Sequence, residues 1–253
     1  MKIAVVTGAS AGIGREFVLA LDRQESFDEI WVVARRKERL EELRAECRNP
    51  VRPVALDLSD LDSVEEYRAL LEREKPHVHI LVNAAGCGVF GLFAEKELQK
   101  QLDSAKLNAL ALTAMCHASL PYMEKGDSIV NMGSNSAWQP VPVQAVYGAS
   151  KSYVLSFSRA LWRELRPRGI HVMCVCPGWI KTEFQQHAQH DAYIRYVDRW
   201  YGPEEVAAQA LRDLKKKKLV SILGHPVRRQ VRLVKFLPVR LVMDIWCRQQ
   251  GIE

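Results

Sequence analysis

The sequence lacks most of the features that mark secreted, membrane-spanning or multidomain proteins. It has no run of about 18 apolar residues, the length that a membrane-spanning helix requires. Its early apolar stretch, Ile3 to Val6, is too short for a secretory signal. It also contains no linker rich in glycine, serine or proline, no low-complexity tract and no internal repeat. With 253 residues and 48% hydrophobic composition, the chain can build a sizeable core, and we expect a single domain.

The positions of the cysteines do not suggest a metal site or a disulfide framework. Cys174 and Cys176 are two residues apart, which is not the usual spacing of zinc ligands. A chain of this size does not need disulfide bonds for stability. We therefore expect reduced thiols in a cytoplasmic protein without a bound metal. The six cysteines, scattered through apolar segments, are Cys47, Cys87, Cys116, Cys174, Cys176 and Cys247.

The positive charge of the chain is concentrated near its carboxyl end. The formal net charge is +6, but the residues from Arg212 onward include eleven basic and three acidic side chains, so the rest of the chain is slightly acidic. A basic tail can bind nucleic acid. This one has no aromatic residues interleaved on a basic face and no nucleic-acid motif, so we expect no nucleic-acid partner.

Short apolar segments alternate with amphipathic helical segments along the chain. Most of the apolar segments are rich in valine and isoleucine on both faces, as strands buried in a parallel sheet are. This alternation predicts an α/β fold with a doubly wound, Rossmann-type parallel sheet of about seven strands. The expected strands are Lys2–Thr7, Glu29–Ala34, Val54–Leu58, His79–Asn83, Ser128–Met132, His171–Val175 and Leu219–Leu223. The expected helices are Ile13–Asp22, Glu38–Cys47, Leu61–Glu74, Glu97–Met123, Ala149–Leu165 and Pro203–Lys215.

Ligands of such sheets bind beyond the carboxyl ends of the strands, and a glycine-rich turn follows the first of these ends. The segment TGASAGIG places Gly8, Gly12 and Gly14 between an expected strand and an expected helix. Glycine lets the backbone turn tightly and approach a pyrophosphate, at which the next helix points its free N–H groups. An ordinary turn can also be rich in glycine, but the strand before this one and the helix after it favour a dinucleotide site.

Two arginines follow the second strand, where an NAD site would carry an acidic residue for the ribose 2′-hydroxyl. Ala34 occupies that place, and Arg35 and Arg36 come next. A guanidinium group binds a 2′-phosphate, which a carboxylate would repel. The segment therefore favours NADP(H), with NADPH preferred over NADH, although a solvated helix start can also carry two arginines.

The later strand ends carry further small and polar residues. Asp57 and Leu58 lie at the end of the third strand, where they could flank an adenine, and a loop of small residues, NAAGCGVFG, follows the fourth. Ser134 follows the fifth strand, and YGASK begins at Tyr147 and ends at Lys151. Residues four apart share one face of a helix, so this Tyr-Lys pair alone also fits an ordinary helix surface.

Six features occur in order, each after the appropriate strand: TGASAGIG, NAAG, Asn108, Ser134, YGASK, and Pro-Gly with Thr182. In this set the chain resembles the single-domain branch of the short-chain dehydrogenase/reductase family, over about residues 2–224. The resemblance implies catalytic roles for Asn108, Ser134, Tyr147 and Lys151. It implies cofactor contacts from Gly8, Ser10, Gly12, Ile13, Gly14, Arg35, Arg36, Asp57, Leu58, Asn83, Ala84, Gly86, Tyr147, Lys151, Pro177, Gly178 and Thr182.

The reaction that the resemblance implies transfers hydride between NADP(H) and a carbonyl or secondary alcohol, with Tyr147 as proton donor or acceptor. Lys151 is expected to lower the pKa of Tyr147 and to hold the nicotinamide ribose, and Ser134 to stabilise the substrate oxygen. Asn108 is expected to anchor a water chain that reprotonates the tyrosine. Ala11 departs from some NADPH-dependent relatives, which carry a basic residue there. A non-catalytic NADPH-binding regulator is the alternative, but such a protein would not need a proton donor.

The substrate is less well defined by the sequence. Glu183 to Tyr201 is expected to form a flexible lid over the site. Its aromatic residues indicate an apolar or aromatic substrate, or simply pack the lid onto the body. Its two histidines have no identifiable metal-binding partners. The residues concerned are Phe184, Tyr193, Tyr196, Trp200, Tyr201, His187 and His190.

Residues 225–253 are expected to form a basic, amphipathic extension that packs on the dinucleotide-binding and catalytic domain formed by residues 1–224. Val227, Val231 and Val234 share one helical stripe, and Pro238 should break the helix. Packing over the cleft or on a partner subunit is favoured over contact with a membrane surface, because the apolar stripes are short. Resemblance to the family also implies a homodimer formed through the helices Glu97–Met123 and Tyr147–Leu165.

Overall fold

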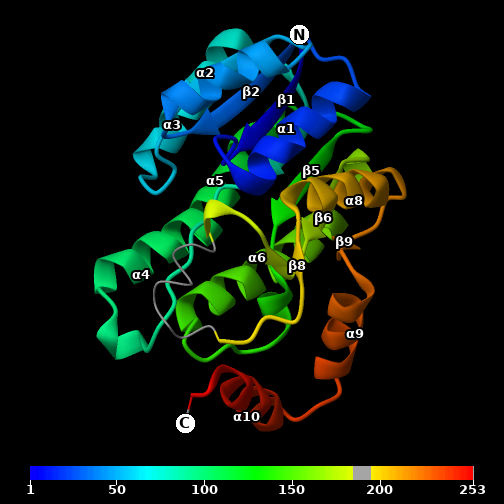
Figure 1. Cartoon of the computed structure of the whole chain (residues 1–253). Coiled ribbons are helices and arrows are strands. Elements are labelled where there is room, and N and C mark those ends of the chain that lie inside the picture. Colours follow the sequence, from blue (N-terminus) through cyan, green and yellow to red (C-terminus); the bar gives the residue numbers. More distant parts are fainter. Residues whose placement is uncertain (185–194, 253) are drawn as a thin grey trace.

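The structure, a computed structural model that describes residues 1–184 and 195–252, is built around one parallel sheet (Figure 1). The strand order is β3-β2-β1-β4-β5-β6-β9, so the chain runs outward from β1 to one edge and then starts again beside β1. This doubly wound order confirms the predicted fold. The strands are β1 (Lys2–Thr7), β2 (Glu29–Ala34), β3 (Val51–Ala55), β4 (His77–Asn83), β5 (Ser128–Met132), β6 (His171–Val175) and β9 (Val220–Ser221).

Helices cover both faces of the sheet because strand side chains alternate between two apolar faces. On β1, Ile3 and Val5 belong to one buried cluster, which includes side chains of α3, α5 and α6. Ala4 and Val6 belong to a second cluster, which includes side chains of α1, α2 and α8. These helices are α1 (Gly12–Gln24), α2 (Lys37–Glu46), α3 (Asp62–Glu74), α5 (Leu112–Ser119), α6 (Ala145–Leu165) and α8 (Pro203–Lys215).

Three features of the structure differ from the predicted elements. The third strand is Val51–Ala55 instead of Val54–Leu58. It lies at the sheet edge, where Pro53 is tolerated, and Leu58 is apolar because it is buried after the strand ends. The predicted helix Glu97–Met123 is divided into α4 (Leu98–Ala105), a π-helical segment (Lys106–Ala111) and α5. A second, two-stranded sheet of β7 (Trp179–Ile180) and β8 (Trp200–Tyr201) was not predicted.

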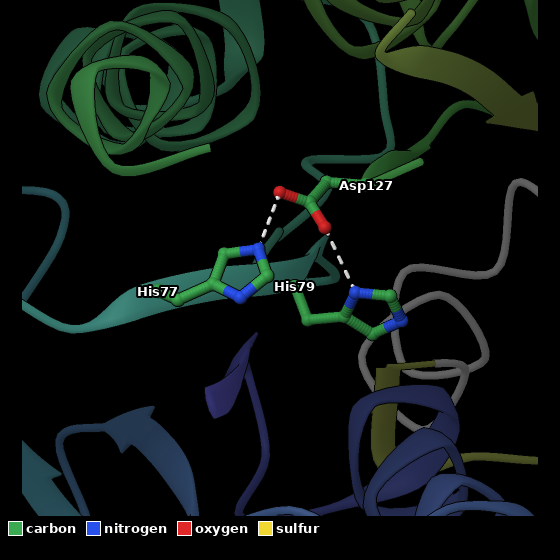
Figure 2. A group of neighbouring side chains, drawn as sticks. All are labelled: His77, His79 and Asp127. Carbon is green, nitrogen blue, oxygen red and sulfur yellow. Dashed lines mark hydrogen bonds and ion pairs between the residues drawn. The ribbon is translucent and has the colours of Figure 1, made fainter. Parts of the chain in front are cut away.

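The amino ends of the parallel strands form what we call the amino edge of the sheet, and their carboxyl ends form the carboxyl edge. At the amino edge, a buried carboxylate joins the start of β4 to the turn before β5. Nε2 of His77 and Nδ1 of His79 each lie 2.8 Å from a different oxygen of Asp127 (Figure 2). The backbone N–H of Glu124 also donates to this carboxylate. Burial alone raises the pKa of Asp127, but the hydrogen bonds from His79, Glu124 and His77 outweigh it and lower the pKa.

Two further helices, α9 (His225–Val234) and α10 (Val239–Gln250), lie at the end of the molecule opposite the amino terminus (Figure 1). Val227 and Val231 of α9 are buried in the cluster that contains α1 and α8. Pro238 lies between the two helices. Among the residues that the structure describes, no helix is both long enough and apolar enough to cross a bilayer.

The last helix is held in place by hydrogen bonds of two side chains, Trp246 and Gln250. The indole N–H of Trp246 donates to the carbonyl oxygen of Pro142 at 3.1 Å. The side chain of Gln250 is fully buried, and its Oε1 accepts from the backbone N–H groups of Arg195 and Tyr196 at 2.8 and 3.0 Å. The carboxyl end of the chain therefore fixes the backbone at Arg195 and Tyr196.

Candidate active site

The turn after β1 has a backbone that only glycine can form. Gly8 has a φ of +67°, and a Cβ there would lie 2.8 Å from backbone atoms of Ala85 at the end of β4. A Cβ on Gly14 would lie 2.3 Å from the carbonyl oxygen of Gly8. Oγ1 of Thr7 accepts from the N–H groups of Ala84 and Ala85 at 3.1 and 3.0 Å. The two strand ends are thus held together with no space for larger residues at the glycine positions.

The helix that follows this turn presents its amino end without a cap. Its N-cap residue, Ala11, has no side chain to bond the free N–H groups, and its first turn holds no acidic residue. A helix start of this kind attracts an anion, because its first N–H groups have no partner within the helix. Ile13 and Gly14 line the adjoining cavity. The tight turn and uncapped helix fit the pyrophosphate of a dinucleotide.

This cavity has a volume of about 380 Å³ and lies at the carboxyl ends of the strands. It brings together Ser134 and every predicted cofactor residue except Asn83. The lining residues among those predicted are Gly8, Ser10, Gly12, Ile13, Gly14, Arg35, Arg36, Asp57, Leu58, Ala84, Gly86, Ser134, Tyr147, Lys151, Pro177, Gly178 and Thr182. Their contacts with a cofactor stay a prediction.

The side chain of Asn83 points into the core instead of the cavity. Its Nδ2 donates to Oδ1 of Asn131 at 2.9 Å, and it also lies 3.3 Å from the sulfur of Cys116. Asn131 in turn donates to Oγ of Ser158 on α6 at 3.0 Å. The amide pair ties β4 to β5, so within this structure Asn83 acts as a positioning residue for the NAAG loop.

Tyr147 and Lys151 lie on one face of α6, as their spacing predicts, with Lys151 buried and Tyr147 half-buried. Nζ of Lys151 lies 5.6 Å from the centre of the Tyr147 ring and donates to the carbonyl oxygen of Met132 at 2.9 Å. Burial raises the pKa of Tyr147 to about 12, against a smaller opposing effect of its hydrogen bond with Ser134. Burial also lowers the pKa of Lys151 to about 8. We expected Lys151 to lower the pKa of Tyr147, but burial of the phenol is the larger influence.

Ser134 has a hydroxyl group whose oxygen is already occupied by donors. Both the backbone N–H and the hydroxyl of Ser136 bond Oγ of Ser134, at 3.2 and 2.8 Å. The proton of Ser134 is therefore directed away from Ser136, and Oδ1 of Asn135 at 3.2 Å is one acceptor for it. A substrate oxygen next to Tyr147 would be another.

Asn108 lies in the π-helical segment and is fully buried beside the site. Its Nδ2 donates to the carbonyl oxygen of Cys87 at 2.8 Å and to Oγ of Ser150 at 3.1 Å. Its Oδ1 accepts from the N–H of Cys87 at 3.0 Å. Single π-turns often occur at functional sites. Here the side chain holds the NAAG loop against α6, and its predicted link to a water chain stays a prediction.

The two arginines after β2 have different surroundings. Arg35 is 72% exposed, and its guanidinium lies 3.7 Å from the Asp57 carboxylate. Arg36 donates to Oγ of Ser10 at 3.0 Å and pairs with Glu183 at 2.8 Å. Glu183 also pairs with Arg39 of α2. Both Arg35 and Arg36 border the cavity, but Arg35 is the less engaged of the two.

A second, larger cavity of about 770 Å³ adjoins the first at Ser134 and Tyr147. Its far wall is formed by α9 and α10, and much of its lining is apolar or aromatic. Several of its residues come from distant segments and belong to no motif that would have indicated them. The lining includes Phe90, Val141, Gln144, Trp179, Phe184, Tyr196, Arg229, Leu233, Val234, Leu237, Val242, Ile245 and Trp246.

Two features of this larger cavity bear on what it can hold. The rings of Phe90, Tyr147 and Phe184 contact one another, with centroids 5.6 to 5.9 Å apart. Gln144 is buried three residues before Tyr147, and its Nε2 has no hydrogen-bond partner in the described part of the chain. A buried donor without a partner is costly, so a ligand acceptor would be favoured there.

The expected lid is only partly within the described residues. Phe184 and Tyr196 line the larger cavity, whereas Trp200 packs its ring on Trp179 at 5.9 Å and Tyr201 is buried. The lid aromatics therefore include both cavity-lining and packing residues. Tyr193, His187 and His190 lie outside the described residues.

Comparisons with known proteins show which proteins this chain is similar to. Residues 2–192 match the family model described as short chain dehydrogenase. An NADP-dependent 3-hydroxy acid dehydrogenase of Schizosaccharomyces pombe is 32% identical over 72% of this chain and 73% of its own. A short-chain dehydrogenase from Sphingobium yanoikuyae, solved with NADPH, superimposes with a TM-score of 0.78 at 28% identity, covering 94% of this chain and 96% of that one. A bulky-bulky ketone specific alcohol dehydrogenase from Comamonas testosteroni gives a TM-score of 0.74 at 28% identity, covering 93% and 91%.

Proposed function

Because the chain belongs to the short-chain dehydrogenase/reductase family and is an NAD(P)-dependent oxidoreductase, we propose that it acts on a bulky, largely apolar carbonyl or secondary alcohol compound with NADP(H). The observation that carries this proposal is the position of Ser134 and Tyr147. They line both the glycine-rich cavity and the larger apolar cavity, so a group in one can react with a group in the other at these two residues.

When bound, the nicotinamide ring supplies or accepts the hydride. Tyr147 acts as the proton donor in the reducing direction, since a pKa of about 12 keeps its phenol protonated at neutral pH. Ser134 directs its hydroxyl proton at the substrate oxygen, because Ser136 already donates to its Oγ. Lys151 holds a positive charge near the phenol while the pH stays below its pKa of about 8.

NADPH is the preferred cofactor in this proposal. The guanidinium of Arg35 is exposed at the cavity rim and makes one long ion pair, to Asp57 at 3.7 Å, so it is available to a 2′-phosphate. Ala34 leaves no acidic side chain immediately before it to repel that phosphate. The relatives described as NADP-dependent and as bound to NADPH are in accord with this choice. The cytoplasmic location also stays a prediction.

The larger cavity supports a bulky substrate with few polar groups. Leucine, valine, isoleucine and aromatic side chains make up half of its lining residues, and burying the apolar part of a ligand against them is favourable. Gln144 offers a buried amide donor close to Tyr147. We therefore expect good substrates to carry a hydrogen-bond acceptor near the reacting carbonyl.

A homodimer is part of the same proposal. Apolar side chains lie exposed on α4, the π-helical segment and α6, the region expected to pair with a second copy. They are Leu98, Leu102, Leu110 and Tyr153, of which Leu98 is 63% exposed. Light scattering at micromolar concentration tests this point, and a monomer would contradict it.

The proposed function is tested with a panel of substrates whose turnover is monitored by NADPH absorbance. Ketones and aldehydes of increasing bulk are compared at equal concentration, each with and without an acceptor next to the carbonyl. We expect kcat/KM to rise with apolar bulk. The control is Gln144→Leu, which should lower kcat/KM only for the compounds that carry the acceptor. A panel in which small hydrophilic aldehydes are the best substrates would contradict the proposal.

A further inference from the structure

The turn between α9 and α10 exposes a continuous run of residues. All seven from Lys235 to Leu241 are exposed, and four of them have large apolar side chains. Phe236 is 86% exposed, which is extreme for a phenylalanine in a folded domain. Leu237, Val239 and Leu241 accompany it. We call Phe236, Leu237, Val239 and Leu241 the apolar turn.

Contacts on both sides of the apolar turn attach α9 and α10 to the rest of the protein. Val227 and Val231 anchor α9 in the core, and Val242 and Trp246 hold α10. Nζ of Lys235 lies 4.3 Å from the centre of the Trp138 ring, so the chain is fixed immediately before Phe236. The exposure of the apolar turn is therefore a fixed feature of the fold rather than an effect of loose packing.

Unpaired basic side chains accompany the apolar turn. Arg232 lies four residues before Phe236 and Arg240 four residues after it, and Arg229 lies one turn before Leu233. All three are exposed, and none of them makes an ion pair within residues 1–184 and 195–252. Asp244 is the only acidic residue on α9 or α10. The apolar side chains are therefore surrounded by positive charges that have no ion-pair partner in the described part of the chain.

We propose that the apolar turn, with Arg229, Arg232 and Arg240, docks on the surface of an anionic lipid bilayer. Apolar side chains of this kind enter the headgroup boundary while basic ones remain with the phosphates. A second copy of the chain is a poorer partner, because a twofold contact at this turn would place like arginines against each other. The two helices lie on the surface and do not span it.

The docking surface is continuous with the mouth of the larger cavity. Leu233, Leu237 and Ile245 are exposed and also line that cavity, as does Arg229. A docked molecule would therefore present the cavity mouth to the bilayer, from which apolar compounds could enter. Docking itself does not depend on the proposed function, and its test measures no enzyme activity.

The test is cosedimentation of the full chain with vesicles at low salt. Vesicles of phosphatidylcholine alone are compared with vesicles that also contain phosphatidylglycerol. We expect binding to the mixed vesicles, at least about tenfold weaker binding to phosphatidylcholine alone, and release by salt. Phe236→Glu should lower binding by on the order of tenfold or more, and Arg232→Glu with Arg240→Glu should have a similar effect.

Two matched variants separate docking from general charge and from misfolding. Lys215→Glu with Lys216→Glu makes the same change in net charge on exposed residues of a distant segment, and should lower binding much less. Phe93→Glu replaces another phenylalanine, 58% exposed, and should leave binding intact. Thermal unfolding confirms that each variant is folded. Equal losses from both charge-reversed pairs would overturn the proposal, as would vesicle binding that Phe236→Glu leaves unchanged.

A third measurement tests whether the apolar turn binds a second copy of the chain instead of a bilayer. If the apolar turn binds a second copy instead, Phe236→Glu changes the mass seen by light scattering in the absence of lipid. The wild-type protein would then fail to bind the mixed vesicles. That pair of results would also overturn the proposal. An unchanged mass with reduced vesicle binding supports it.

Discussion

At the amino edge of the sheet both oxygens of the Asp127 carboxylate have hydrogen-bond donors, whereas at the carboxyl edge Lys151 and Gln144 are buried, Tyr147 is half-buried, and the three side chains make few hydrogen bonds. The two edges belong to the same strands, β4 and β5. The difference shows in the pKa values. Hydrogen bonds lower that of Asp127, while burial raises that of Tyr147 and lowers that of Lys151. The amino edge stabilises the charged form of Asp127, whereas burial at the carboxyl edge shifts the titration of Tyr147 and Lys151 toward their neutral forms.

This contrast suggests that residues at the amino edge contribute to stability, whereas residues at the carboxyl edge serve the reaction. A buried group that lacks partners costs stability, and it remains available for a ligand. The amino edge offers no such group at Asp127. Changes at the amino edge should therefore affect unfolding, and changes at the carboxyl edge should affect turnover.

The largest expected effect is at the carboxyl edge. Tyr147→Phe should lower kcat by about 10²–10⁴-fold, because the phenol is the proton donor, while the melting temperature stays close to that of the wild type. The readouts are NADPH absorbance and calorimetry. Tyr153→Phe on the same helix is the matched control and should retain activity. A Tyr147→Phe enzyme with more than about a tenth of wild-type activity would show that the assignment is wrong.

At the amino edge, a change is expected to affect stability and not turnover. Asp127→Asn should lower the free energy of unfolding by roughly 1–3 kcal/mol, since it removes the charge that His77, His79 and the Glu124 N–H stabilise. kcat should not change. Because the folded-state pKa of Asp127 is lowered, its contribution is present above the ordinary carboxyl value of about 4 and is lost as the pH falls below it. The deficit of the variant, measured by urea unfolding, should therefore shrink in acid.

Asp244→Asn is the matched control for this variant, because Asp244 is exposed and has no hydrogen bond or ion pair in the part of the chain that the structure describes. It should leave the unfolding free energy within about 0.5 kcal/mol of the wild type. An Asp127→Asn protein with normal stability and lower kcat would reverse the assignment of the two edges.

A smaller effect is expected at the rim of the glycine-rich cavity. Arg35→Ala should reduce the preference for NADPH over NADH by roughly tenfold or more, because one charge-assisted contact with the 2′-phosphate is lost. The ratio of kcat/KM for the two cofactors measures it. Arg23→Ala, which removes an exposed arginine at the end of α1, should not alter the ratio. Equal kcat/KM with both cofactors in the wild-type enzyme would rule out the NADPH preference.

The smallest effect is one of pH. The pKa of Lys151 is about 8, so its charge is present below that pH and is lost above it. The rate of carbonyl reduction should then decline severalfold as the pH rises from about 7 to 9. Lys151→Arg, which stays charged, should move this decline to higher pH even if its overall rate is lower. A flat profile to pH 10 in the wild type would contradict the role of this charge.

Motifs that depend on neighbouring residues along the chain could be predicted from the sequence. TGASAGIG lies between β1 and α1, and Tyr147 and Lys151 share a helix face, as their spacing requires. Features that depend on distant contacts could not. Asn83 has the expected position in NAAG, but its side chain turns toward Asn131 because the core offers an acceptor there. Val54–Leu58 has the apolar composition of a strand, yet strand pairing with β2 ends at Ala55.

The larger cavity shows the same limit more clearly. Phe90, Gln144 and Trp246 come from three separate segments, and no spacing in the sequence brings them together. The Pro238 break between the last two helices could be predicted, but the anchoring of α10 on Pro142 could not. The residues that line the larger cavity are therefore brought together by tertiary packing, whereas the glycine-rich and Tyr-Lys motifs depend on local sequence.

The burial of Gln250 has a consequence for how this protein can diversify. Because its amide holds the backbone of Arg195 and Tyr196, the final helix positions a residue that lines the substrate cavity. The proposed catalytic residues Ser134, Tyr147 and Lys151 belong to α6 and a strand end, not to the final helix. Descendants of this gene could therefore exchange the last helix and acquire new substrates while the reaction chemistry is inherited unchanged. A fusion partner attached at this end of the chain would act on the same cavity.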